Sequence, residues 1–311
     1  MKYSIVFPGQ GSQSLGMLSD LKSNFPVVSE VFQEASDALG VDLWKIAQED
    51  QEALNLAVNT QPIMLASGYA TFKVLSNEVE LTPVCFAGHS LGEYTALVAS
   101  KSLNFFDAVN LVRKRAELMQ SAVPVESGSM VAILGLEDQK IIELCIKANE
   151  IGVVEAVNFN SPGQVVIAGE KKAVVYACEL MKKAGAKRAL ILPVSVPSHC
   201  SLMEDAAIDF KDSVESVNFK MGTAQVIHNV DANYSGNIKE IKSKLVEQLH
   251  KPVLWTLTVQ NMKKLGIESL IESGPGKVLA GLTRRIDKSL SGSAIIDEIT
   301  LKSTIEGMSD A

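Results

Sequence analysis

The sequence predicts an α/β protein in two parts: a large domain with a central, mainly parallel sheet, and a small ferredoxin-like (βαββαβ) domain inserted into it. Two observations predict this class. In the first and last thirds of the chain, short apolar runs typical of buried strands alternate with segments whose apolar residues recur at helical spacing. Between these thirds the order becomes strand, helix, strand, strand, helix, strand, which is that of a ferredoxin-like unit.

The first third opens with an apolar run at residues 4–7, a predicted strand that ends in the loop "PGQG". Pro62 stands near the start of the first long segment with helical spacing, so we expect Gln61 in the first turn of that helix. The other predicted elements of this third are a strand over residues 84–87, a turn at Ser90, a helix through about Ala99 and a helix over residues 105–120.

Residues 125–197 form the predicted small domain, and residues 1–124 and 198–311 form the large one. The small domain has predicted strands over residues 129–135, 153–159, 164–170 and 187–194, and predicted helices over residues 137–150 and 171–185. A proline lies in each of the segments that bracket it, "AVPVESG" and "VSVPSHC", as expected of domain connections. Strand and helix signals resume after His199, so the last third should complete the sheet of the first.

Composition excludes several classes of protein. The 311 residues are 47% hydrophobic, enough to bury a large core, and the net charge of -7 argues against general binding to nucleic acid or to an anionic membrane. No apolar run approaches the roughly 18 residues of a membrane helix. Four cysteines are scattered without a C-x-x-C pair, which fits neither a disulfide scaffold nor a zinc site. We therefore expect a cytoplasmic protein without a metal.

The stretch "GHSLG" at residues 88–92 has the pattern G-x-S-x-G, in which a sharp strand-to-helix turn presents a nucleophilic serine. The predicted strand before it and the predicted helix after it provide the context that this turn requires. Ser90 is therefore the candidate nucleophile, and the Leu91 N–H at the helix start is a candidate oxyanion donor. The alternative is a plain tight turn.

A serine nucleophile needs a base, and the chain has four histidines. His89 adjoins Ser90, so its side chain should diverge from the serine. His228 lies in an apolar strand and suits a core position, whereas His250 follows a helix and suits a solvated one. His199 remains, at the seam between the predicted domains, where it can face a cleft. A structural role for His199, or another histidine as base, is the alternative.

No acidic residue between Ser90 and His199 stands at an obvious strand end, where the third member of a triad is expected. The sequence therefore predicts a Ser–His pair whose imidazole is oriented by a backbone carbonyl.

Neither glycine-rich loop predicts a nucleotide cofactor. "PGQGSQ" fails the dinucleotide pattern because Ser14 replaces its third glycine, and "SGPGKV" fails the P-loop pattern because Val278 replaces the Ser or Thr. The first loop can instead offer the Gln10 N–H as a second oxyanion donor, or it is a simple turn.

Arg115 lies beside the apolar stripe of its predicted helix, four residues from both Leu111 and Met119. A guanidinium in that position needs a carboxylate partner. The alternative for Arg115, as for its neighbours Arg113 and Lys114, is a solvated helix face.

Several segments together resemble, in order and spacing, the malonyl-CoA:acyl carrier protein transacylase family of dissociated (type II) fatty acid synthesis in bacteria. They are "FPGQGSQ", "TQPIMLAS", "GHSLGEYTAL", "VNFNSPGQVVIAG", "AKRALILPVSVPSHCSLM", "QLHKPVLWT" and "ESGPGKVLAGLTRRI", spread over about residues 2–286. The resemblance implies a hydrolase-like α/β domain carrying a ferredoxin-like insert. It also implies that malonyl-CoA acylates Ser90 and that the malonyl group then passes to the phosphopantetheine thiol of acyl carrier protein, without a cofactor.

The resemblance also implies roles for individual residues. His199 matches the general base and acid, Gln248 the residue whose backbone carbonyl orients it, and Gln10 and Leu91 the oxyanion donors. Arg115 matches the arginine that pairs with the free carboxylate of malonate, Gln61 matches a pocket residue near it, and we also place His89 among the substrate-binding residues.

For the partners, we expect malonyl-CoA, an acidic acyl carrier protein, and a monomeric enzyme. Basic residues clustered in an otherwise acidic chain are the candidates for docking the carrier protein: Lys187, Arg188, Arg284 and Arg285.

Two other functions fit parts of the sequence. A serine hydrolase, either a thioesterase or an esterase, would release the acyl group to water; its patatin-like form is disfavoured because the chain has no Asp-Gly pair. A catalytically silent module that binds carrier protein would form no acyl-enzyme, and the presence of Ser90, His199 and Arg115 argues against it.

Overall fold

The computed structural model describes residues 2–124, 126–194 and 196–309 and contains two separate sheets. The large sheet has the order β7-β2-β1-β8-β9, and every strand pair in it is parallel. Its strands are β1 (Tyr3–Phe7), β2 (Cys85–Gly88), β7 (Gln225–Ile227), β8 (Ser269–Ser273) and β9 (Ser291–Ile295). Strands from the last third of the chain thus complete the sheet begun by the first third, and the α/β class with a central parallel sheet is confirmed.

The second sheet is antiparallel, with the order β4-β5-β3-β6. Its strands are β3 (Gly128–Leu134), β4 (Val154–Ser161), β5 (Gln164–Glu170) and β6 (Arg188–Ile191). Together with two helices they follow the βαββαβ order that the sequence predicts. The expected domain boundary at residue 125 lies outside the described residues.

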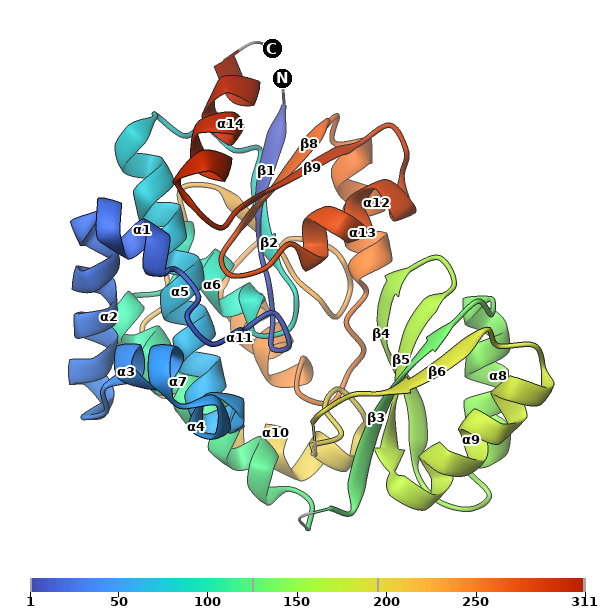
Figure 1. Cartoon of the computed structure of the whole chain (residues 1–311). Coiled ribbons are helices and arrows are strands. Elements are labelled where there is room, and N and C mark those ends of the chain that lie inside the picture. Colours follow the sequence, from blue (N-terminus) through green and yellow to red (C-terminus); the bar gives the residue numbers. More distant parts are fainter. Residues whose placement is uncertain (1, 125, 195, 310–311) are drawn as a thin grey trace.

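Helices account for most of the remaining structure (Figure 1). They are α1 (Ser19–Asn24), α2 (Pro26–Leu39), α3 (Leu43–Glu49), α4 (Gln51–Asn55), α5 (Ala57–Glu78), α6 (Gly92–Ala99), α7 (Phe105–Ser121), α8 (Asp138–Ala148), α9 (Lys171–Lys183), α10 (Glu204–Ser216), α11 (Ile238–Glu247), α12 (Trp255–Lys264), α13 (Val278–Ile286) and α14 (Glu298–Ser309), with a 3-10 turn, η1 (Ser201–Met203). None of the helices in the described part of the chain has the length and apolar character needed to cross a membrane.

Burial explains why the strands of the large sheet are continuous apolar runs. All five residues of β1 are buried, and their side chains alternate between two clusters. Ile5 and Phe7 pack in the cluster that includes α5, α6 and α7, whereas Val6 packs with α12 and α13 on the opposite face. Both faces of a parallel sheet are therefore covered, as this class of sheet requires.

The small sheet buries its two faces differently. Helices α8 and α9 lie together on one face, the side away from the large sheet (Figure 1). The other face carries Met130, Val157 and Val166, which pack with Cys200 just after the chain leaves the small sheet. This face points toward the large sheet (Figure 1). The loops of the two sheets therefore meet in the boundary between them, which we call the seam.

Helix α5 begins earlier than the sequence suggests. It starts at Ala57, so Gln61 lies in the second turn and Pro62 lies inside the helix. A proline there leaves the carbonyl of Val58 without its helical N–H partner. Arg113 on α7 replaces that partner, because its Nη1 donates to the Val58 oxygen at 3.2 Å. The expected position of Gln61 in the first turn was therefore wrong. The hydrogen bond that Pro62 removes from α5 is replaced by one from a side chain of α7.

Candidate active site

Ser90 lies in the tight turn between β2 and α6. Its φ of 50° is in the left-handed region, which residues other than glycine adopt only at a cost in energy. The two glycines of the motif make the turn possible. A Cβ on Gly88 would lie 1.9 Å from the Gly92 carbonyl carbon, and one on Gly92 would lie 2.1 Å from the Phe7 oxygen. The sequence thus forces Ser90 out at the carboxyl end of β2, where α/β sheets bind ligands.

His199 and Ser90 are brought together from opposite sides of the seam. The Ser90 Oγ lies 2.8 Å from the His199 Nε2, and the His199 Nδ1 lies 2.6 Å from the backbone oxygen of Gln248. A carbonyl oxygen can only accept, so the proton of the neutral imidazole is on Nδ1. The Nε2 is then an acceptor, and the Ser90 hydroxyl donates to it. This is the arrangement of a general base.

Burial keeps this imidazole neutral. His199 is 2% exposed, and its burial, with a contribution from the nearby Arg115 charge, lowers its pKa from 6.5 to about 3. The hydrogen bond to Gln248 opposes that shift only in part. At neutral pH the ring is therefore able to accept the serine proton.

Arg115 is a buried cation, 1% exposed, in the middle of α7. Its Nη1 donates to the Gln61 Oε1 at 2.8 Å, and its Nη2 donates to the Gln248 Oε1 at 3.1 Å and to the Ser90 Oγ at 3.3 Å. Its Nε has no partner, and no carboxylate of the described residues is within salt-bridge distance. The protein thus holds a guanidinium beside the nucleophile without neutralising it.

The loops that carry Gln10 and Leu91 lie side by side because β1 and β2 are neighbours, with Phe7 paired to Gly88. Gly9 allows the close approach, since a Cβ there would lie 2.5 Å from the His89 oxygen. Within residues 2–124, 126–194 and 196–309, neither the Gln10 N–H nor the Leu91 N–H has a hydrogen-bond acceptor. Both remain free for an oxyanion at this edge of the sheet.

His89 hydrogen-bonds to the small sheet and not to Ser90; its divergence from the serine was predicted, whereas its partner was not. Its Nε2 lies 2.8 Å from the Asn160 Oδ1 of β4, and its ring packs near Trp255. Burial lowers its pKa, so it is a neutral donor to Asn160. His89 therefore links the serine turn to the small sheet.

A cavity of about 320 Å³ opens over Ser90 between the two sheets. The large part of the chain contributes Gln10, Asn55, Leu56, Ala57, His89, Ser90, Gln120, Ser198 and His199, and the side of the small sheet contributes Met130, Asn158, Leu192, Pro193, Val194 and Val196. The mixture of apolar walls and a few convergent polar groups is typical of a small-molecule site.

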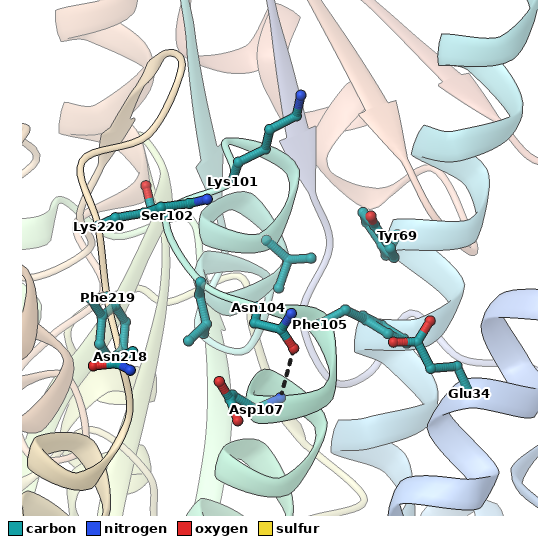
Figure 2. A pocket seen from close by; sticks show the side chains of 12 residues that line it. Glu34, Tyr69, Lys101, Ser102, Asn104, Phe105, Asp107, Asn218, Phe219 and Lys220 are labelled. Atoms are coloured by element: carbon teal, nitrogen blue, oxygen red, sulfur yellow. Dashed lines mark hydrogen bonds between the residues drawn. The ribbon is translucent and has the colours of Figure 1, made fainter.

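A second hollow, of about 480 Å³, lies elsewhere, beside the start of α7 (Figure 2). Lys101, Asn104, Asp107 and Lys220 are among its lining residues, and none of the candidate site residues is. One of its polar side chains stabilises a helix end. The Asn104 Oδ1 caps α7 by accepting the N–H groups of Phe106 and Asp107.

The candidate docking residues are all exposed, and they lie in two places. Lys187 and Arg188 are at the start of β6, and Arg284 and Arg285 are in the last turn of α13. The Arg285 Nη1 donates to the Gln164 Oε1 of β5 at 3.0 Å. Arg285 on α13 therefore contacts the small sheet across the seam.

Two residues around Ser90 escaped the sequence reasoning, Asn229 and Glu93. The Asn229 Oδ1 accepts the Ser90 N–H at 2.7 Å, and its Nδ2 donates to the Gly88 oxygen at 2.7 Å. Asn229 follows β7, which is parallel to β2, so its place at the carboxyl ends of the strands was an available signal. Glu93 is buried and pairs with His228, the expected core histidine, at 2.7 Å.

Comparison with known proteins agrees with this geometry. A family model described as an acyl transferase domain matches residues 4–288. The malonyl CoA-acyl carrier protein transacylase of Haemophilus influenzae is 51% identical over 298 residues, covering 95% of this chain and 96% of that protein. The chain belongs to this transacylase family. The resemblance seen in the sequence is thereby confirmed.

Other transacylases extend the match over almost the whole chain. That of Escherichia coli strain K12 is 48% identical over 306 residues, covering 98% of this chain and 99% of its own length. A solved S-malonyltransferase from Vibrio cholerae superposes with a TM-score of 0.95 at 50% identity, over 98% of this chain and all of that one. A malonyl-transacylase solved in complex with a type II polyketide acyl carrier protein gives a TM-score of 0.97 at 47% identity, over 99% of this chain and all of that one.

Proposed function

We propose that this chain is a malonyl-CoA:acyl carrier protein S-malonyltransferase that works through a malonyl ester on Ser90. The observation that carries the proposal is the unneutralised Arg115 guanidinium, 3.3 Å from the Ser90 Oγ. In a malonyl group a single methylene separates the free carboxylate from the reacting carbonyl, so an acyl group on Ser90 brings its carboxylate within reach of Arg115. A bidentate pair in a buried site favours malonyl over acetyl, which leaves the guanidinium unpaired.

In the first half-reaction the Ser90 oxygen attacks the thioester carbonyl while its proton passes to the His199 Nε2. The N–H groups of Gln10 and Leu91 hold the resulting oxyanion. The C–S bond then breaks, and the imidazolium returns the proton to the departing CoA sulfur. The second half-reaction reverses these steps with the phosphopantetheine thiol of acyl carrier protein as the attacking group. Every proton transfer has an assigned group, so we propose that no cofactor takes part.

The Gln248 carbonyl orients the His199 ring and stabilises the imidazolium, while Gln61 holds the Arg115 guanidinium. His89 lines the cavity and is assigned to substrate binding beside Asn160. We further propose a cytoplasmic monomer that supplies extender units for fatty acid synthesis. All four cysteines are free thiols, as in a reducing compartment, and one chain provides every group that the mechanism uses.

Intact-mass measurement tests the function. After mixing with malonyl-CoA, the protein should gain the mass of one malonyl group, and Ser90→Ala should gain none. The adduct should persist in buffer and disappear when holo acyl carrier protein is added. Rapid loss to water without an acceptor would instead favour a thioesterase or esterase. Failure of the folded wild type to form any adduct would favour the silent binding module.

For docking, we propose that Lys187, Arg188, Arg284 and Arg285 attract the acidic carrier protein to the mouth of the cavity. Charge reversal at each pair should raise the KM for carrier protein several-fold and weaken its salt dependence, with little change in acylation by malonyl-CoA. The matched control is reversal at Lys101 and Lys220, which lie in the second hollow. Equal effects at the two places would reject the assignment.

A further inference from the structure

Gln248 contacts the catalytic groups in two different ways. Its backbone oxygen accepts from the His199 Nδ1, whereas its side-chain Oε1 accepts from the Arg115 Nη2 at 3.1 Å. Its Nε2 donates to the Ser90 backbone oxygen at 3.0 Å and to the Glu93 Oε2 at 2.8 Å. The orientation of this side-chain amide therefore determines whether an oxygen acceptor or an NH₂ donor faces the Arg115 guanidinium.

Glu93, in the first turn of α6, is fully buried and accepts at both oxygens. Its Oε1 faces the His228 Nδ1 at 2.7 Å, and its Oε2 accepts from the Asn229 N–H at 2.9 Å as well as from Gln248. The Asn229 and Gln248 groups can only donate. A side chain that accepts at both of its oxygens suits such a set of donors.

The acceptors around the Nε2 fix the orientation of the Gln248 amide, and Glu93 is the nearest of them at 2.8 Å, ahead of the Ser90 oxygen at 3.0 Å and the Asn229 Oδ1 at 3.3 Å. The NH₂ end must face Glu93, so the oxygen end faces the guanidinium of Arg115. With the amide reversed, its NH₂ group would point at the N–H groups of Arg115, and a buried donor would face a donor. Glu93 itself touches neither the Ser90 Oγ nor the guanidinium at hydrogen-bond distance.

We propose that Glu93 is a positioning residue for acyl-group selection: through the Gln248 amide it holds Arg115 in the orientation that receives the malonyl carboxylate. This inference rests on the proposed function and adds to it a determinant of specificity that lies outside the cavity. The same carboxylate also holds the backbone of Asn229, whose side chain supports the Ser90 turn. Glu93 thus connects the nucleophile and the carboxylate-binding group.

The test measures the rates at which malonyl-CoA and acetyl-CoA acylate Ser90, by intact mass, in the full chain. Glu93→Gln should lower the malonyl-to-acetyl rate ratio by about tenfold, because an uncharged amide oxygen accepts the Gln248 NH₂ group more weakly than a carboxylate oxygen does. The matched control is Glu272→Gln, since Glu272 is equally buried but bonds to the Ala280 N–H, away from this network. Its ratio should not change. A parallel fall of both rates in Glu93→Gln indicates a purely structural role and overturns the proposal.

A second variant keeps the proposal testable if Glu93→Gln does not fold. Gln248→Met removes the side-chain amide and retains the backbone oxygen that His199 needs. It should also lower the ratio, and the double variant should be no less selective than Gln248→Met alone, because both changes act on one amide. The proposal that Glu93 acts through the Gln248 amide would be overturned by an unchanged malonyl-to-acetyl rate ratio in Gln248→Met. It would also be overturned if the losses of selectivity in the two single variants added up in the double variant. A wild type that is never malonylated contradicts the proposed function itself, whereas a selective wild type with an equally selective Glu93→Gln contradicts only this inference.

Discussion

The Ser90 cavity and the hollow beside the start of α7 differ in how their polar groups are used. In the hollow beside Lys101 and Lys220, none of the lining side chains has a buried polar atom without a partner, and Asn104 is occupied in capping α7 (Figure 2). At the smaller Ser90 cavity, the Asn158 Oδ1 of the lining is buried and unmatched among the described residues, and so is the Nε of Arg115, which contacts Ser90 from behind the lining. Size therefore does not identify the site; the Ser90 cavity differs from the larger hollow in having unmatched polar groups beside a nucleophile and a base.

Of the substitutions that distinguish the two hollows, replacement of Arg115 should change the rate of malonylation most. We expect Arg115→Ala to reduce malonylation of Ser90 roughly 100-fold while acetylation changes much less, because only malonyl loses a buried ionic partner. Rates from quenched-flow intact mass would measure this. Lys114→Ala, an exposed neighbour on the same helix, is the control and should retain the wild-type ratio. Equal losses of malonylation and acetylation would remove the basis for the carboxylate-binding role.

A smaller effect concerns the pH dependence of stability near the Ser90 cavity. The pKa of His199 is about 3 in the folded chain and near its ordinary 6.5 when unfolded, so between these values the unfolded chain binds more protons. Stability contributed by the neutral ring is thus present above about pH 6.5 and is lost as the pH falls toward 3. In His199→Gln the free energy of unfolding should decline less steeply over this range, as followed by urea denaturation. Parallel curves for the two proteins would refute this.

The smallest effect is expected in the second hollow. Lys101→Ala and Lys220→Ala should leave the rates of malonylation and transfer to carrier protein unchanged, because both side chains lie away from Ser90. Steady-state kinetics at saturating malonyl-CoA would measure this. A substantial loss of activity in either variant would mean that the two hollows are not as separate as their linings indicate.

The parts of the fold that depend on local sequence were predictable. Apolar runs such as residues 4–7 indicated buried strands, and the helix and strand order of the small sheet followed from periodicity. Gly88 and Gly92 indicated the turn, because no other residue fits there. The start of α5 was not predictable, since Pro62 lies inside the helix and the Val58 carbonyl accepts instead from Arg113, 55 residues away in the chain.

The candidate site was predictable only for residues with distinctive chemistry. Ser90, His199 and Arg115 are a nucleophile, a base and a buried charge. Residue types with such chemistry can be picked out in a sequence by their motif or by their place beside apolar residues. Asn229 and Glu93 act by holding backbone and amide groups. Their contacts span 139 and 155 residues, to Ser90 and Gln248 respectively, and appear only once the strands are paired.

Pairing of β1 with β2 also sets the positions of the two proposed oxyanion donors relative to each other. The two proposed oxyanion donors, Gln10 and Leu91, are about 80 residues apart in the chain, and only the alignment of Phe7 with Gly88 puts them at one point. A slip of one residue along these strands would move one donor by more than 3 Å relative to the other. In the proposed mechanism the catalytic rate therefore depends on this alignment, and the return of activity during refolding would show when β1 and β2 have paired in register.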